Sequence, residues 1–137
     1  MTFKKLDHIA IVVANTDEAL KLYRDVLGLP VRFSQVLEDQ NVRLTHLDMG
    51  NADLQLVEPL VDDHPLQKAL AERGEHLHHF CFYVDSVEEM IATTLPSMGV
   101  PSRDAQPRSG PNGRQTAFID PANTHNVLIE ITSDTES

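Results

Sequence analysis

Residues 77–84 read LHHFCFYV and repeat an earlier stretch, LDHIAIVV at residues 6–13. The alignment of these stretches shifts the chain by 71 positions, and the same shift superposes Gly99 on Gly28. Between those points each copy has an apolar, strand-like run and then a helical pattern that ends at the glycine. The chain therefore contains one structural unit twice.

Both copies have the same order of predicted elements. The first copy is predicted to form a strand at 6–14, a helix capped by Asn15 or Thr16 and closed by Gly28, and strands at 31–37, 42–49 and 53–58. The connector is predicted to hold a helix at 65–73, and the second copy a helix starting at the Ser86 capping box, a long loop at 104–113 and strands at 114–119 and 126–132. Each copy thus reads β-α-β-β-β, with a helix and strands in one α+β module.

A module of this kind exposes one hydrophobic sheet face, so we expect two copies to pair by pseudo-twofold symmetry around a shared cavity. The expected organisation is a single domain at 1–137, with module one at about 4–60 and module two at about 75–133. The length of 137 residues and 41% hydrophobic content suit one globular domain that buries a core.

Composition also limits the location and the partners of the protein. The sequence has no apolar run of the ~20 residues that a membrane helix needs, and its N-terminus lacks the apolar core of a signal peptide. We therefore expect a cytoplasmic protein without a membrane partner. A single cysteine, Cys81, excludes an internal disulfide and fits a reducing compartment.

The net charge of −10 repels a phosphate backbone and argues against nucleic-acid binding. A small anionic ligand would need a local basic cluster, for which Arg103, Arg108 and Arg114 are the candidates. A solvated basic loop on an acidic protein explains these three residues equally well.

Two polar residues recur at corresponding points of the repeat, each inside an apolar strand. His8 in the first copy corresponds to His79 in the second, and Gln55 corresponds to Glu130. Under pseudo-twofold symmetry the four side chains would converge. Two imidazoles, an amide oxygen and a carboxylate form a donor set for one borderline divalent ion, Co²⁺, Ni²⁺, Mn²⁺ or Zn²⁺. The sequence therefore predicts a metal site with ligands His8, Gln55, His79 and Glu130.

Two further residues lie on the strand faces that would line the cavity. His46 shares a strand face with Leu44, and it either looks into the cavity or sits at its rim. Cys81 shares the face of His79 and corresponds to Ala10 in the first copy, so we expect it to line the pocket and not to act as a nucleophile. Simple core packing explains Cys81 as well.

The chain resembles the vicinal oxygen chelate superfamily and, within it, the methylmalonyl-CoA epimerases. Four stretches carry the resemblance: LDHIA at 6–10, EHLHH at 75–79, PRSG at 107–110 and VLIEI at 127–131. The resemblance implies paired β-α-β-β-β modules and places His8, Gln55, His79 and Glu130 at the metal positions. It also implies a homodimer that acts on an acyl-CoA-type small molecule.

The resemblance also implies a reaction. Two oxygens of a 2-substituted malonyl thioester chelate the ion, which acidifies the Cα proton, and a carboxylate then removes that proton. Some epimerases carry a second glutamate as base on the third strand, where this chain has Leu44, which cannot transfer a proton. Glu130 is therefore the expected base, and His46 is the expected second acid or base because its ordinary pKa suits neutral pH.

Other activities on this fold remain open at this point. A glyoxalase I type lyase uses similar metal geometry to isomerise a glutathione hemithioacetal, and a drug-sequestering resistance protein uses the fold without catalysis. A ring-cleaving dioxygenase fits less well, because those enzymes use two histidines and one glutamate on iron in longer chains. Asp120-Pro121 stands where many epimerases have His-Pro, which bears on the substrate more than on the fold.

Overall fold

The computed structural model describes residues 2–135, which divide into two compact units. The N-terminal unit holds residues 8–78, and the C-terminal unit holds residues 2–7 and 79–135. Strands β1 (Lys5–Val12) and β5 (His76–Tyr83) each pass from one unit into the other.

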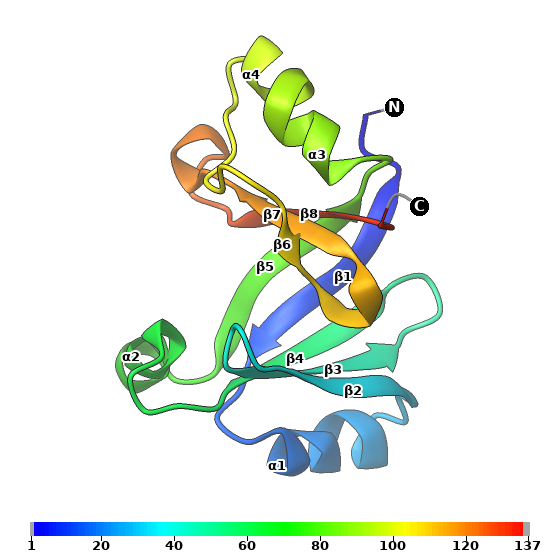
Figure 1. The fold of residues 1–137 in the computed structure, drawn as a ribbon. Coiled ribbons are helices and arrows are strands. Elements are labelled where there is room, and N and C mark those ends of the chain that lie inside the picture. The colour runs from blue at the N-terminus through cyan, green and yellow to red at the C-terminus, as the bar shows by residue number, and fades with distance from the viewer. Residues whose placement is uncertain (1, 136–137) are drawn as a thin grey trace. The chain divides into compact units, whose positions relative to one another are not determined.

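The N-terminal unit has the predicted β-α-β-β-β order (Figure 1). After β1 it contains α1 (Thr16–Leu20), a π-helical turn η1 (Lys21–Val26), β2 (Val31–Leu37), β3 (Val42–Asp48), β4 (Asp53–Pro59) and α2 (Pro65–Arg73). The strand order is β2-β3-β4-β1, antiparallel except for the parallel pair of β1 and β4. The predicted bounds of β2 and α2 are correct to the residue.

Local chemistry explains where the first helix begins and which face it buries. The side chain of Asn15 accepts a hydrogen bond from the Glu18 backbone N–H at 2.9 Å, so Asn15 is the N-cap. One face of the helix then packs on β3 and β4, where Leu20 joins a buried cluster with Leu47 and Leu56. Burial of this apolar stripe holds the helix against the sheet.

The C-terminal unit repeats the same topology (Figure 1). After β5 it contains α3 (Val87–Glu89), η2 (Met90–Thr94), α4 (Leu95–Ser97), β6 (Arg108–Ser109), η3 (Pro111–Gly113), β7 (Gln115–Ile119), η4 (Pro121–Asn123) and β8 (Ile129–Ser133). Its strand order is β6-β7-β8-β5, with β5 parallel to β8. Because the two orders match, the predicted α+β fold with a repeated module is confirmed.

Two predicted boundaries in the second copy are wrong. The stretch at 104–113 is not one long loop, because β6 forms inside it and pairs antiparallel with β7. Strand β8 begins at Ile129 and not at 126, because the preceding turn continues through His125 and Asn126 with φ of 55° and 66°. A left-handed pair of this kind cannot continue a strand ladder.

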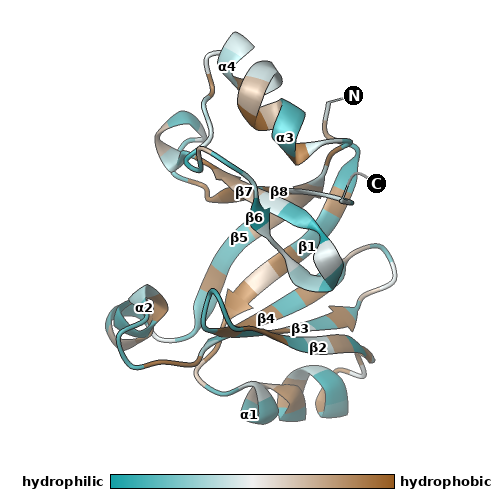
Figure 2. Ribbon diagram, in the orientation of Figure 1, coloured by the Kyte–Doolittle hydropathy of each residue, from teal (hydrophilic) through white to brown (hydrophobic). Residues whose placement is uncertain are grey.

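Figure 2 shows hydrophobic (brown) and hydrophilic (teal) residues along the strands, and burial alternates from one residue to the next in parts of β1 and β5. In β5, for example, His79 and Cys81 are buried whereas Phe80 between them is exposed. The core of the C-terminal unit includes Val84, Leu95 and Ile131. Within residues 2–135, no helix has the length and apolar character needed to cross a membrane.

The two parallel strand pairs, β1 with β4 and β5 with β8, align equivalent residues of the two copies. Ala10 lies opposite Gln55 in the β1–β4 ladder, and Cys81 lies opposite Glu130 in the β5–β8 ladder. These four residues are the pairs that the sequence repeat makes equivalent. Gln55 and Glu130 therefore occupy the same place in their own units.

Candidate metal centre

The N-terminal half-site consists of His8 on β1 and Gln55 on β4. His8 lies opposite Asp53, so Gln55 is two residues further along β4 and on the same sheet face. Both side chains are buried, with 4% and 3% of their surface exposed. A buried imidazole and a buried amide need polar partners, and His46 supplies one to the amide of Gln55.

The C-terminal half-site consists of His79 on β5 and Glu130 on β8. The Nε2 atom of His79 lies 3.2 Å from Oε1 of Glu130. Both residues are 8% exposed, and the ring of His79 meets the ring of Phe118 edge-on at 5.2 Å. The structure thus brings together the two predicted ligands of this unit in a water-poor environment.

The donors of each half-site suit a divalent ion. Each unit offers one imidazole nitrogen and one oxygen donor, from Gln55 in one and Glu130 in the other. Imidazole with amide or carboxylate oxygen is a donor combination that Zn²⁺, Co²⁺, Ni²⁺ and Mn²⁺ accept. The carboxylate of Glu130, beside His79, adds an anionic oxygen donor to its half-site. The donor residues of both half-sites therefore fit a divalent metal ion.

His46 lies inside the N-terminal unit and not at a rim. Its Nε2 is 2.9 Å from the amide nitrogen of Gln55, its Nδ1 is 2.9 Å from Oδ2 of Asp53, and the ring of Phe33 stacks on it at 4.4 Å. Because the Gln55 amide donates to Nε2, Nδ1 carries the proton and donates to Asp53. The amide carbonyl oxygen of Gln55 is then the atom left for a cation.

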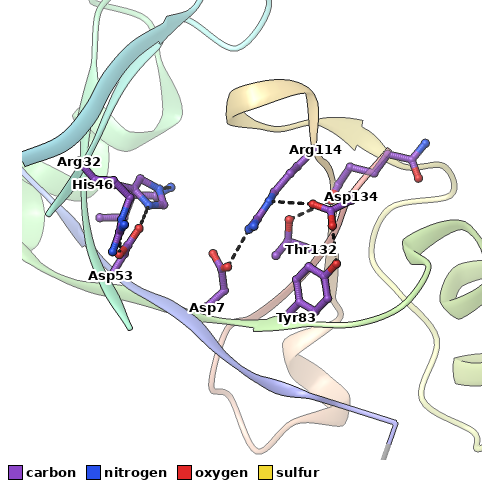
Figure 3. A network of polar contacts seen from close by, with 10 residues as sticks. Asp7, Arg32, His46, Asp53, Tyr83, Arg114, Thr132 and Asp134 are labelled. Atoms are coloured by element: carbon purple, nitrogen blue, oxygen red, sulfur yellow. Dashed lines mark hydrogen bonds and ion pairs between the residues drawn. The ribbon is translucent and has the colours of Figure 1, made fainter. Parts of the chain in front are cut away.

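Asp53 is a residue that the sequence reasoning missed. Figure 3 shows it between His46 and Arg32, whose Nε lies 3.0 Å from its Oδ1. The hydrogen bond from His46 to Asp53 fixes the tautomer and the ring orientation of His46. Carboxylates that hydrogen-bond to histidines commonly have this effect in metal sites. The sequence signal that could have identified Asp53 is its spacing from Gln55. The two residues are two positions apart on one face of β4, and β4 pairs with the strand that carries His46.

Leu44 lies in the apolar core of the N-terminal unit, with Ala10 and Val57 in the same buried cluster. It packs there and offers no group for proton transfer. Asp120, the other departure from the epimerase pattern, caps η4 by accepting a hydrogen bond from the Ala122 N–H at 3.0 Å. That role is local to the turn before β8.

Cys81 is fully buried beside the C-terminal half-site. Burial, and then the nearby carboxylates of Glu130 and Asp7, raise the pKa of the Cys81 thiol well above its usual range. The thiolate is the nucleophilic form, so a thiol held protonated at neutral pH is a poor nucleophile. The structure gives Cys81 a packing position on the face of His79.

We expect Cys81→Ala to keep catalytic activity within about tenfold and to lower the free energy of unfolding by about 1 kcal/mol, because a small buried group is lost. Thermal denaturation followed by circular dichroism and steady-state kinetics would measure both effects. A folded, metal-loaded variant that lost activity by several orders of magnitude would contradict the packing role.

The three arginines of the predicted basic cluster have two different environments. Arg114 is held in the C-terminal unit by Asp7, 2.7 Å from its Nη1, and by Asp134, which also accepts a hydrogen bond from the Tyr83 hydroxyl (Figure 3). Arg103 and Arg108 instead lie over the ring of Phe118. Arg114 is thus part of the framework, and the other two contact the ring of Phe118, which also contacts His79.

Comparison with known proteins agrees with this architecture. The sequence model of the Glyoxalase/Bleomycin resistance protein/Dioxygenase superfamily matches residues 7–118. The uncharacterized protein YqjC of Bacillus subtilis is 36% identical over 127 residues, which are 93% of this chain and 90% of YqjC. Mouse mitochondrial methylmalonyl-CoA epimerase is 28% identical, covering 93% of this chain and 71% of the mouse protein.

Solved structures give the same result. Methylmalonyl-CoA epimerase from Mycobacterium tuberculosis has a TM-score of 0.90 and 29% identity, with 98% of this chain and 91% of that chain covered. A Streptomyces coelicolor methylmalonyl-CoA epimerase variant in complex with 2-nitronate-propionyl-CoA has a TM-score of 0.87 and 33% identity, covering 97% and 96% of the two chains. These similarities confirm the predicted resemblance and the prediction of an epimerase-type enzyme. The chain belongs to the glyoxalase/bleomycin resistance protein/dioxygenase superfamily.

Proposed function

We propose that this protein is a metal-dependent epimerase that removes the proton α to the thioester carbonyl of a 2-substituted malonyl-CoA. The observation that carries the proposal is the buried pair of His79 and Glu130, with Nε2 and Oε1 3.2 Å apart. The similar epimerase structure bound to 2-nitronate-propionyl-CoA supports an acyl-CoA substrate. A homodimer, which the resemblance also implies, stays a prediction.

We infer further that His8, Gln55, His79 and Glu130 together hold one divalent ion, Co²⁺, Ni²⁺, Mn²⁺ or Zn²⁺. The support is the matched composition of the half-sites, each with one imidazole and one oxygen donor at equivalent ladder positions. When bound, such an ion acts as a Lewis acid toward the thioester and carboxylate oxygens and lowers the pKa of the Cα proton.

The protein side chains supply the proton transfers. The Glu130 carboxylate is the proposed base, because it is the acidic group of the half-sites and Leu44 offers no group that could accept a proton. Its contact with His79 holds the carboxylate in place beside the proposed ion. His46 is the proposed second acid or base. For this role its Nε2 has to exchange the Gln55 N–H for a proton, which it then returns to the opposite face of the enolate.

The assay for this function uses one epimer of methylmalonyl-CoA in D₂O with the metal-loaded protein. We expect both interconversion of the epimers and replacement of the Cα proton by deuterium, followed by ¹H NMR. Turnover of a glutathione hemithioacetal without turnover of the malonyl thioester would contradict the proposal and favour a glyoxalase I type reaction.

The His46 role gives a separate prediction. In His46→Phe, we expect Cα exchange to continue from the epimer that Glu130 deprotonates and to fall by about 10²-fold or more from the other epimer. Single-turnover exchange in D₂O, started from each epimer, measures the two rates. Metal content and the circular dichroism spectrum must match those of the wild type, since the variant also removes a partner of Gln55. If the variant exchanged the Cα proton at the wild-type rate from both epimers, His46 would be excluded as the second acid or base.

A further inference from the structure

A chain of polar contacts runs from the surface of the N-terminal unit to the buried amide of Gln55. Its first member is Arg32 on β2, which is half exposed and lies 3.0 Å from Asp53 through Nε and 3.1 Å from Asp48 through Nη2 (Figure 3). The other oxygen of Asp53 lies 2.9 Å from Nδ1 of His46, and Nε2 of His46 lies 2.9 Å from the amide nitrogen of Gln55. The antiparallel register places His46 opposite Gln55 and Asp48 opposite Asp53, so the strand pairing holds these contacts in line.

The first two members of this chain have a fixed hydrogen-bonding role, and the last two do not. A guanidinium only donates and a carboxylate only accepts, whereas a neutral imidazole and a primary amide can each be turned either way. The carboxylate of Asp53 therefore keeps the proton of His46 on Nδ1, and Nε2 is left as an acceptor. Nε2 then takes an N–H of Gln55, and the carbonyl oxygen of Gln55 is the atom available to a cation. The direction of both hydrogen bonds is thus set at Asp53.

We infer that Asp53, held by Arg32, is a positioning residue that controls metal binding by fixing which atom of the Gln55 amide is available to the ion. This inference rests on the metal site in the proposed function, and it does not depend on the proposed reaction. A carbonyl oxygen binds a divalent cation, whereas an amide N–H repels one. With the hydrogen bonds reversed, the N-terminal half-site would therefore lose its oxygen donor although Gln55 itself is unchanged. Asp53 acts here through His46 and Gln55, two hydrogen bonds from the oxygen that it orients.

Asp53→Asn tests the direction of the hydrogen bonds at nearly constant side-chain shape. Arg32 donates to the oxygen of the new amide, so the amide nitrogen faces Nδ1 of His46. The proton of His46 then moves to Nε2, which donates to the carbonyl oxygen of Gln55. Long-range ¹H–¹⁵N NMR of the metal-free protein at alkaline pH should show His46 protonated on Nδ1 in the wild type and on Nε2 in the variant. Titration with Co²⁺, followed by visible absorption, should show binding about 10- to 100-fold weaker in the variant.

A second substitution is expected to reverse the effect of the first. In the double variant Asp53→Asn with Arg32→Met, no guanidinium holds the amide oxygen, so the new amide can turn and accept from Nδ1 of His46. We expect this variant to regain the Nδ1 proton and most of the lost Co²⁺ affinity, whereas two losses from a merely structural ion pair would not cancel. Arg32→Met alone keeps the carboxylate and should bind Co²⁺ nearly as tightly as the wild type. Asp25→Asn is the matched control, because it makes the same change in the exposed pair with Arg24 and should alter neither measurement.

Several outcomes would overturn the inference. A folded wild type with His46 protonated on Nε2 would do so even if Asp53→Asn failed to fold. Asp53→Asn with the wild-type tautomer or the wild-type Co²⁺ affinity would do so as well, and so would a folded double variant that binds Co²⁺ more weakly than Asp53→Asn. A wild type that binds no Co²⁺ would contradict the proposed metal site, while a tautomer change in Asp53→Asn would still support control of the Gln55 amide by Asp53. A wild type that binds Co²⁺ but does not epimerise methylmalonyl-CoA would contradict the proposed reaction alone.

Discussion

His79→Ala is expected to give a folded protein that no longer retains stoichiometric divalent metal. The substitution removes one of the two strong neutral nitrogen donors of the proposed centre and leaves Glu130 without its partner 3.2 Å away. Elemental analysis by inductively coupled plasma mass spectrometry, after desalting, measures the metal bound per chain. We expect the metal content to fall from about one ion to near zero, and epimerase activity to fall with it.

His78→Ala is the matched control, because it removes an imidazole from the adjacent position of β5. Successive strand residues point to opposite faces, so this variant should keep its metal. If His79→Ala kept one tightly bound ion per chain, the assignment of His79 as a ligand would be wrong.

Glu130→Gln is expected to separate metal binding from proton transfer. Gln55 shows that an amide is accommodated at the equivalent ladder position of the N-terminal unit. The variant should therefore retain metal, because the amide oxygen can still coordinate, whereas an amide cannot accept the Cα proton. We expect kcat to fall by about 10²–10⁴-fold with a much smaller change in KM. Steady-state kinetics and Cα deuterium exchange, at measured metal occupancy, would show both effects.

Gln55→Glu is the complementary control, which adds a carboxylate to the N-terminal half-site and leaves the proposed base in place. It should keep its metal and at least part of its activity. Deuterium exchange at the wild-type rate in Glu130→Gln would exclude Glu130 as the base, and another group would then have to abstract the proton.

The repeat made much of the fold predictable from the sequence. Strand β2 and helix α2 have their predicted bounds because clear turn residues flank them, and Asn15 and Ser86 cap helices as their positions suggested. The equivalence of Gln55 and Glu130 was also readable, since each is a polar residue in an apolar run. Their ladder positions follow from the same periodicity.

Other features depend on contacts that no periodicity encodes. Strand β6 has two residues, too few to show an alternating pattern. The contact of Asp53 with His46 depends on how β3 and β4 are aligned, and the different environments of Arg108 and Arg114 depend on which carboxylates the folded unit brings near them. Side-chain partners of this kind appear only when the register and the turns are known.

The parallel pairing of the first and last strands in each unit has an evolutionary consequence. His8 with Gln55, and His79 with Glu130, are each supplied by the two end strands of a single β-α-β-β-β segment. Duplication of one ancestral gene segment would therefore copy a whole pair of the proposed ligands at once, with no need to evolve a second pair independently. Later exchange between glutamine and glutamate at this position alters the charge by one unit and leaves the backbone ladder intact. Descendants of the duplication could thus diversify in chemistry while they kept the same scaffold.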